Sequence, residues 1–299
     1  MQYCVKNKIP RIIMPICDDT LFTLKLSSFL FDKFFPEDIE IDVLGFQKPD
    51  FNISKKMNFV SMDSEQVGGA KSWSKYILRH LEQIDDEEVL FTLEDFFPTK
   101  EPNTNILQEV LSLMKKNKSI GRFDLTYDSY CHGDSIKIGS MCNLDLMIKT
   151  KYSDYSVSTQ PSIWNKKFLI DILSNTTSPW DFEINGTILS KKMKYEVLSF
   201  GDSTFKNFPT YWIHKGAVSR KCPGKINILG LDFDTIREMV GLGFFEESDL
   251  VWGMFSNIKS PSFLELGGYN FDPRKMPLHE ASKTNWREYH NIYLQGEAK

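Results

Sequence analysis

The sequence lacks the patterns that mark several large classes of protein. Its five cysteines are scattered and include no Cys-x-x-Cys pair, which argues against a zinc site or a disulfide framework. They are Cys4, Cys17, Cys131, Cys142 and Cys222. No window approaches the roughly 18 apolar residues of a membrane span. The N-terminus shows no apolar segment followed by a small-residue cleavage site. We therefore expect a cytoplasmic protein without a transmembrane segment.

Several motifs of common enzymes are also missing. The sequence contains no Walker A loop, no Gly-x-Gly-x-x-Gly, no Gly-x-Ser-x-Gly and no His-Glu-x-x-His. Common nucleotide hydrolases, Rossmann dehydrogenases, α/β-hydrolases and zincins are therefore poor first hypotheses. The net charge of -4 argues against a nucleic-acid-binding protein, which usually carries a basic face. A local basic pocket for a phosphate remains compatible with that charge.

The first half of the chain alternates strand-like and helix-like segments. Hydrophobic residues make up 41% of the 299 residues, enough for a large core. Apolar runs predict strands at residues 11–17, 39–46, 57–62 and 89–93. Helical spacing of apolar residues predicts helices at residues 20–35, 73–84 and 105–116. Such alternation predicts an α/β fold with a mainly parallel central sheet flanked by helices.

The second half is more mixed. Its patterns predict strands at residues 120–128, 143–150, 155–164, 194–200 and 208–218, and helices at residues 165–173 and 178–193. The last forty or so residues carry scattered aromatics and charges and read as peripheral. No repeat or linker is evident, so we expect one domain with a C-terminal extension.

Carboxylates follow three of the predicted strands. They are Asp18–Asp19, Asp63 and Glu94–Asp95. Ligands of such sheets bind outside the carboxyl ends of the strands, so these side chains are expected to meet on one rim. Oxygen ligands suit Mg²⁺ or Mn²⁺. The alternative is that each pair is a solvated strand end that caps a turn.

Aromatic and acidic residues also cluster near predicted element boundaries. Trp164 and Trp180 lie beside polar residues, as in sugar-binding clefts, or else form a core pair. Asp181 and Glu183 fall in the first turn of a predicted helix, where the positive helix end stabilises a carboxylate. Such a carboxylate could deprotonate a hydroxyl nucleophile, or it could simply cap the helix.

Two further segments are candidates for binding phosphate. Gly68 and Gly69 precede a helix start and could place backbone N–H groups near a ligand. His214, Lys215 and Arg220 concentrate positive charge in an acidic chain and could neutralise a diphosphate. A solvated charged loop is the alternative for the second segment.

The ordered set of motifs resembles a group of GT-A-type glycosyltransferases encoded in bacterial surface-polysaccharide loci, large DNA viruses and phages. It runs from residue 11 to 220 and comprises VLFTLEDFFP, STQPSIWNKKFLIDIL, SPWDFE and WIHKGAV. The resemblance implies a UDP- or GDP-linked sugar donor and a hydroxyl acceptor on a glycan. It implies the cytosol of a bacterium or of an infected host, and leaves peripheral membrane contact open.

The resemblance also implies roles for residues on the donor side. Cys17, Asp19 and Thr20 would line the nucleotide pocket with Asp63, and Gly69, Lys71 and Trp73 would lie near the donor. LEDFF stands where such enzymes carry Asp-x-Asp, and this departure leaves Mn²⁺ or Mg²⁺ dependence open. Asp95 would be the metal ligand, with Glu94 beside it. Without a metal, the donor's charge would be met by Lys71, His214, Lys215 and Arg220.

On the acceptor side the resemblance implies that Gln160, Ser162, Trp164 and Trp180 face sugar. Glu183 would be the base of an inverting displacement, with Asp181 beside it. The catalytic domain would span residues 1–260, with a donor half to about residue 125, an acceptor half from 126, and an extension at 261–299. Two alternatives remain: a non-catalytic glycan-binding protein on a transferase fold, and a metal-dependent phosphoesterase using Asp19, Asp63 and Asp95.

Overall fold

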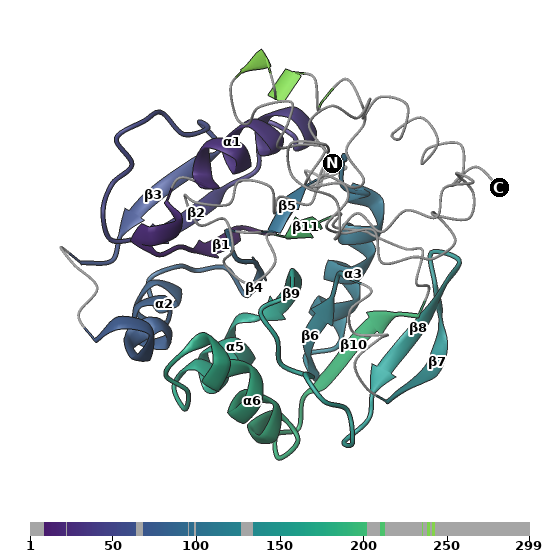
Figure 1. Ribbon diagram of the computed structural model, residues 1–299. Coiled ribbons are helices and arrows are strands. Elements are labelled where there is room, and N and C mark those ends of the chain that lie inside the picture. The colour runs from purple at the N-terminus through teal and green to yellow at the C-terminus, as the bar shows by residue number, and fades with distance from the viewer. Residues whose placement is uncertain are drawn as a thin grey trace, which may run out of the picture. The chain divides into compact units, whose positions relative to one another are not determined.

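A computed structural model describes most of the first two thirds of the chain (Figure 1). The described residues are 9–21, 23–63, 68–94, 96–98, 100–126, 134–201, 210–212, 235, 238–239 and 241–242. The chain forms two compact units, Met1–Thr210 and Tyr211–Lys299. In the second unit, Thr235, Glu238, Met239 and Gly241 are helical. Among the described residues no helix is long and apolar enough to cross a membrane.

Nine strands of the first unit form one mixed sheet, in the order β3-β2-β1-β4-β9-β6-β10-β8-β7. They are β1 (Ile12–Pro15), β2 (Ile41–Gly45), β3 (Met57–Ser61), β4 (Glu88–Phe91), β6 (Ile120–Asp124), β7 (Ser135–Met141), β8 (Leu144–Lys149), β9 (Ser162–Asn165) and β10 (Glu196–Phe200). Two short strands lie outside this sheet, β5 (Phe96–Pro98) and β11 (Thr210–Trp212).

The sheet has a parallel core. The strands β3, β2, β1 and β4 pair in parallel, as do β6 and β10. Strand β9 runs antiparallel between β4 and β6, and β8 runs antiparallel to both β10 and β7. Only β8 and β9 therefore oppose the direction of the other strands. This arrangement confirms the predicted α/β class with a mainly parallel sheet.

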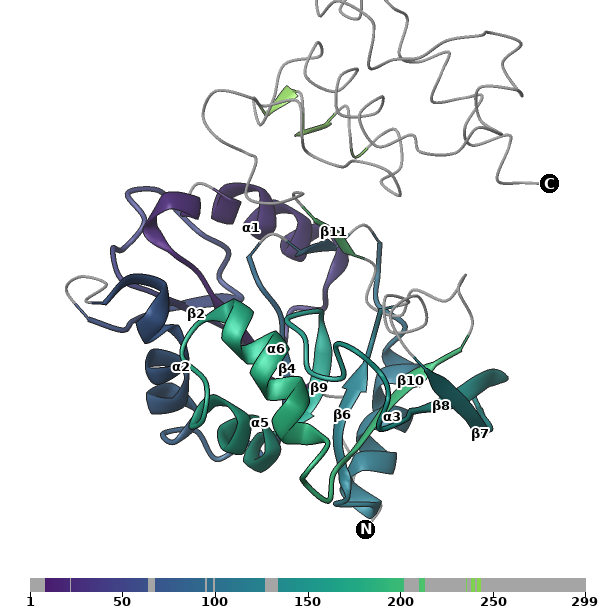
Figure 2. The same ribbon diagram turned by 60° about the horizontal axis from the view of Figure 1, so that its bottom comes forward.

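Helices cover both faces of the sheet (Figures 1 and 2). Ile12 and Met14 of β1 pack with residues of α1 (Thr23–Phe34) and α3 (Thr104–Lys116). Ile13 faces α2 (Trp73–Leu81), α5 (Lys166–Leu173) and α6 (Pro179–Ser190). This alternation follows from the two-residue period of a strand. The described residues also form two short 3-10 helices, η1 (Asp18–Thr20) and η2 (Gly69–Ser72).

One predicted strand was too long, and one strand was not predicted. Residues 155–161 were expected to extend the strand at Ile163, but β9 begins only at Ser162. Their polar groups bond to side chains instead, since Val157 N–H donates to Thr187 Oγ1 and Ser158 Oγ accepts from Arg122. Strand β7 was not anticipated at all. It is an exposed edge strand and its apolar residues do not make one buried face.

The first test of this packing concerns Gly121 in β6. A Cβ at this position would lie 2.4 Å from Phe168 of α5, so the ring or the helix must shift. We expect Gly121→Ala to lower the free energy of unfolding by about 1–3 kcal/mol, measured by urea denaturation. Gly139→Ala in β7 is the matched control, because nothing lies within 4 Å of its added Cβ. Equal effects of the two substitutions would contradict the packing described for β6 and α5.

Candidate functional site

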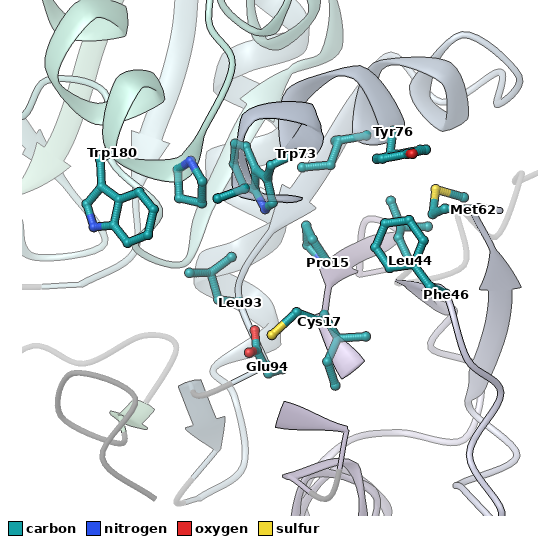
Figure 3. Close-up of a pocket in the computed structure, with 14 residues that line it drawn as sticks. Pro15, Cys17, Leu44, Phe46, Met62, Trp73, Tyr76, Leu93, Glu94 and Trp180 are labelled. Atoms are coloured by element: carbon teal, nitrogen blue, oxygen red, sulfur yellow. The ribbon is translucent and has the colours of Figure 1, made fainter. Parts of the chain in front are cut away.

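A cavity of about 220 Å³ lies at the carboxyl ends of the parallel strands (Figure 3). The strands and the residues just after them contribute Pro15, Ile16, Cys17, Leu44, Phe46, Met62, Leu93 and Glu94 to its lining. The helices contribute Ala70 of η2, Trp73, Tyr76 and Ile77 of α2, and Pro179 and Trp180 of α6. Ligands of open α/β sheets bind at this edge. Cys17, Trp73, Glu94 and Trp180 are the predicted site residues that the structure brings together here.

The wall formed by Trp73 depends on an unusual turn. Gly68 and Gly69 have φ angles of +88° and +56°, a region that glycine enters without a steric penalty. The turn leads through η2 into α2 and starts the helix at Trp73. The Trp73 ring meets Phe91 and Phe182 edge to face, with centroids 6.0 and 5.5 Å away. The glycine pair therefore helps to position the Trp73 ring that forms the wall. Neither glycine is among the residues lining the cavity.

Glu94 supplies the carboxyl group of this mostly apolar cavity. Thr20 Oγ1 donates to Glu94 Oε1 at 2.6 Å, and the Cys17 sulfur lies 3.2 Å from the same hydroxyl. Ser27 of α1 donates to the Glu94 carbonyl at 3.3 Å. Figure 3 shows Cys17 and Glu94 facing each other. Among the described residues, the carboxyl therefore has a neutral hydroxyl as its partner and no cation.

This environment changes the acidity of Glu94. Burial raises the pKa of its carboxyl, because removing a carboxylate from water disfavours the charged form. The hydrogen bond from Thr20 opposes that rise but does not cancel it. A ligand that donates a hydrogen bond to Glu94 would favour the ionised form, so ligand binding and protonation are linked at this residue.

The start of α6 is fixed by capping interactions. The Ser178 hydroxyl accepts from Asp181 N–H at 3.2 Å, and Pro179 occupies the first turn. Asp181 accepts from Thr177 N–H at 2.7 Å and from Thr177 Oγ1 at 3.0 Å, and also from Asn185. These bonds, led by that from Asn185, lower the pKa of Asp181. One Asp181 oxygen therefore serves the capping role that the sequence left open, and the other accepts from Asn185 one turn along the helix.

Glu183 lies one turn along α6 from Pro179. Its Oε1 accepts from Thr159 N–H at 2.8 Å and from Thr159 Oγ1 at 2.9 Å, so both bonds fall on one oxygen. Oε2 has no partner among the described residues. The side chain is partly buried and does not line the cavity. It is nevertheless held on the same helix as Trp180, with one oxygen available to accept a proton.

The segment that holds Glu183 is itself held by a buried arginine. Arg122 of β6 is fully buried and donates to Ser162 Oγ at 3.0 Å, the Ser156 carbonyl at 3.0 Å and Ser158 Oγ at 2.8 Å. It also pairs with buried Asp124 at 3.2 Å. Residues 156–162 are thus tied to the sheet on one side and, through Thr159, to Glu183 on the other.

Two residues expected to face sugar are in the core instead of at a surface. Trp164 is fully buried and stacks on Phe168 with centroids 5.6 Å apart. Ser162 is fully buried, and its hydroxyl accepts from Arg122 and donates to the Gln160 carbonyl. Gln160 is partly exposed, and Trp180 is 67% exposed and lines the cavity. Of the four, Trp180 alone lines this cavity.

The remaining predicted residues divide into two sets. Lys71 and Asp63 are exposed near the cavity edge, and neither lines it. Asp95, His214, Lys215, Arg220 and the side chain of Asp19 lie outside the described residues. Within the described part of the chain, no group of three or more His, Cys, Asp or Glu side chains could hold a metal ion. The described residues alone do not make a metal site.

Sequence reasoning missed most of the apolar lining and the arginine. Leu44, Phe46 and Met62 close predicted strands, so their positions alone could have placed them at the ligand edge. Tyr76 lies between members of the helical stripe that begins at Trp73. Arg122 and Asp124 stand two residues apart in an otherwise apolar strand and therefore on one side of it, which is a signal for a buried ion pair. That signal was available in the sequence.

Solved structures with a similar fold include enzymes of two kinds. A UDP-glucose pyrophosphorylase complexed with UDP-glucose is 12% identical with a TM-score of 0.41, over 70% of this chain and 94% of that one. The mannosyltransferase PcManGT from Pyrobaculum calidifontis, in complex with GDP-Man and Mn²⁺, is 14% identical with a TM-score of 0.39. That match covers 65% of this chain and 55% of PcManGT, so the chain spans about half of its length.

A cytidylyltransferase from Leptospira borgpetersenii is 12% identical with a TM-score of 0.38, over 79% of this chain and 94% of that one. No protein-family model and no curated protein matches the sequence. The likeness is one of fold. At these scores and identities it carries no argument about activity, which is therefore argued below from the chain's own residues.

Glu94→Gln tests the electrostatics of the cavity. The pKa of Glu94 is raised in the folded state, so its charge destabilises the fold as pH rises through that value. Below the ordinary glutamate pKa of about 4.3, Glu94 is protonated and therefore neutral, as the Gln of the variant is at every pH. We expect the variant to melt higher than the wild type near pH 8, and this advantage to shrink towards pH 4, in thermal scans at both pH values.

Asp181→Asn is the control of opposite sign. Its pKa is lowered in the folded state, so its charge stabilises the fold above the ordinary aspartate pKa of about 3.9 and that contribution is lost in acid. This variant should melt lower than the wild type near pH 8 and lose the difference towards pH 3. A stabilisation by Glu94→Gln that does not change with pH would contradict the burial described for Glu94.

Proposed function

We propose that the chain is a glycosyltransferase that moves a sugar from a nucleotide-sugar donor to a hydroxyl of a glycan acceptor. The observation that supports this most is the cavity at the carboxyl ends of β1, β2 and β4. Its aromatic side chains offer stacking faces for a planar base or a sugar ring. Its volume of about 220 Å³ suits part of such a ligand. Glu94 can accept hydrogen bonds from N–H or O–H groups.

The two ends of the cavity suggest a division of labour. Phe46 and Met62 lie on the side away from Trp180 (Figure 3). We assign the Phe46 side, with Cys17 and Glu94, to the nucleoside. We assign the Trp180 side to the sugar and acceptor, because α6 also carries Glu183. Lining residues come from both proposed halves of a domain that we place at residues 1–260.

Glu183 is the proposed base of an inverting displacement. Its free oxygen would take the proton from the acceptor hydroxyl while that oxygen bonds to the anomeric carbon. The bond to the nucleoside diphosphate breaks on the opposite face and the leaving group keeps the electron pair. Thr159 holds the carboxylate in place through two hydrogen bonds. A base positioned by such bonds accelerates proton transfer typically by about 10²–10⁴-fold.

The nucleoside diphosphate that leaves is negatively charged, so positive charge beside it would stabilise it. Lys71 in η2 is exposed, and we assign it to the diphosphate. We also propose Asp95 as the ligand of a Mn²⁺ or Mg²⁺ ion, if one is used. Such an ion would neutralise charge on the diphosphate. No step of the reaction described above depends on it.

Nucleotide binding provides the direct test. We expect one class of nucleotide or nucleotide sugar to raise the melting temperature, because it binds the folded state only. At about 100 times its dissociation constant it adds roughly 2.7 kcal/mol of stability. For a domain of 150–250 residues this corresponds to a shift of several degrees. Scans are run with and without Mn²⁺ to measure any dependence on the metal.

Trp180→Ala and Ile184→Ala refine this measurement. Both side chains are largely exposed on α6, but only Trp180 lines the cavity. Loss of one aromatic contact is worth about 0.5–1.5 kcal/mol, so the first variant should bind the nucleotide sugar roughly two- to tenfold more weakly and the second should not. Failure of every nucleotide to shift the melting temperature, with oligosaccharide binding retained, would replace the proposal with the non-catalytic glycan-binding alternative.

Glu183→Gln tests the chemical role. Gln keeps the oxygen that Thr159 bonds, so the fold and donor binding should persist while transfer falls by about 10²-fold or more. Asp181→Asn is the matched variant on the same helix, and we expect it to keep transfer because the Asp181 oxygens accept hydrogen bonds from Thr177 and Asn185. Transfer is measured as the release of nucleoside diphosphate from the donor at increasing concentrations of glycan. Full transfer by Glu183→Gln, or pyrophosphate formed from a nucleoside triphosphate and a sugar phosphate, would contradict the proposal.

A further inference from the structure

One surface of the first unit concentrates exposed apolar side chains. Eight large hydrophobic side chains are exposed among the described residues: Ile136, Ile138, Tyr152, Tyr155, Trp180, Ile184, Ile188 and Leu242. Three of these belong to α6, and two, Tyr152 and Tyr155, shortly precede the segment that runs beside it. Monomeric proteins usually scatter such residues singly, so a concentration of this kind marks an interaction site.

The centre of this surface is a stripe along α6. Trp180, Ile184 and Ile188 are 67%, 58% and 48% exposed. They are spaced four residues apart and therefore lie on one side of the helix. The side of α6 that packs against the sheet is formed by other residues, among them Phe182 and Gly186. The helix is thus apolar on two sides, and only one of them contributes to the core.

Aromatic residues extend the surface beyond the helix. Residues 156–159 run antiparallel to α6, because Ser156 bonds to Ser190, Val157 to Thr187 and Thr159 to Glu183. The residues just before this segment carry Tyr152 and Tyr155, which are both exposed. Tyrosine and tryptophan have an apolar ring and one polar atom, which suits a boundary between water and hydrocarbon.

Lysines gather at the C-terminal end of the stripe. Lys191, Lys192 and Lys194 follow α6 directly and are exposed. Lys151 is exposed as well and lines the same shallow depression as Lys191. No carboxylate of the described residues forms an ion pair with any of the four. The one carboxylate that lines this depression, Glu196, accepts a hydrogen bond from Ser119, so this end of the surface is locally positive in a protein with a net charge of -4.

We propose that this surface, which we call the α6 surface, docks the protein on an anionic lipid bilayer. It comprises the Trp180–Ile184–Ile188 stripe, the two tyrosines and the four lysines. Apolar and aromatic groups would enter the headgroup region, and the lysines would meet anionic headgroups. A second copy of the chain would instead bring four more lysines to the contact. The nearby acids Asp181 and Glu183 already accept hydrogen bonds from their neighbours.

The inference does not depend on the proposed transfer reaction, because binding to lipid is measured without substrate. It nevertheless has a geometric consequence. Trp180 belongs both to the stripe and to the cavity lining. Docking through the stripe would therefore bring the Trp180 side of the cavity to the membrane surface.

The test is flotation of the full chain with vesicles of phosphatidylcholine alone or with roughly 30% phosphatidylserine. We expect binding to the anionic vesicles that weakens with salt. The double variant Ile184→Asn/Ile188→Asn should bind about tenfold more weakly or not at all. The matched control is Ile136→Asn/Ile138→Asn on β7, where two isoleucines are 59% and 52% exposed without the lysine cluster; it should bind as the wild type does.

A third variant, Lys191→Gln/Lys192→Gln/Lys194→Gln, should remove the preference for anionic vesicles. All substituted side chains are exposed, and equal melting temperatures confirm that each variant is folded. The absence of vesicle binding by the wild type would overturn the proposal, as would an equal loss in the β7 control. So would a concentration-dependent dimer in sedimentation that only the α6 variant abolishes, since the surface would then be an interface between two copies.

Discussion

The interaction on which the candidate site depends most is the pairing of the Arg122 guanidinium inside the protein. A fully buried charge is tolerated only when it is paired and its donors are satisfied. Here the charge partner is Asp124, and the other donors go to Ser156, Ser158 and Ser162. The guanidinium also lies over the Trp164 ring, 5.3 Å from its centroid. The residues that satisfy the arginine are therefore fixed in space.

This constraint passes from the sheet to the surface of the molecule. The segment that Arg122 holds contains Val157 and Thr159, which bond to Thr187 and Glu183. These bonds position α6 along its whole length, from the proposed base near its start to the end beside Ser190. Phe182 of the same helix packs on Trp73 and Trp164. One buried ion pair thus helps to position the cavity wall, the proposed base and the exposed stripe.

The fold was more predictable from the sequence than the site. The alternation of strands and helices is visible in the local periodicity of apolar residues. The cap of α3 is equally local, since the Asn103 side chain accepts from Ile106 N–H three residues further on. The carboxyl end of a strand could be recognised at Glu94 for the same reason. Its partner Thr20 lies 74 residues away in the sequence, and no local pattern connects the two. The segment at 155–161 was misread because its alternation is like that of a strand, whereas its hydrogen bonds go to side chains.

The same distinction explains the tryptophans. Both Trp164 and Trp180 stand beside polar residues in the sequence, and nothing local separates them. In the folded chain, Trp164 faces α5 from a strand that lies between β4 and β6, so neighbours on every side cover it. Trp180 lies in the first turn of α6, where its ring is 67% exposed and lines the cavity. Position within the fold therefore decides which ring can meet a ligand. Arg122 holds the segment to which α6 bonds. Replacing the arginine would therefore disturb the Trp180 wall, although the arginine itself does not line the cavity.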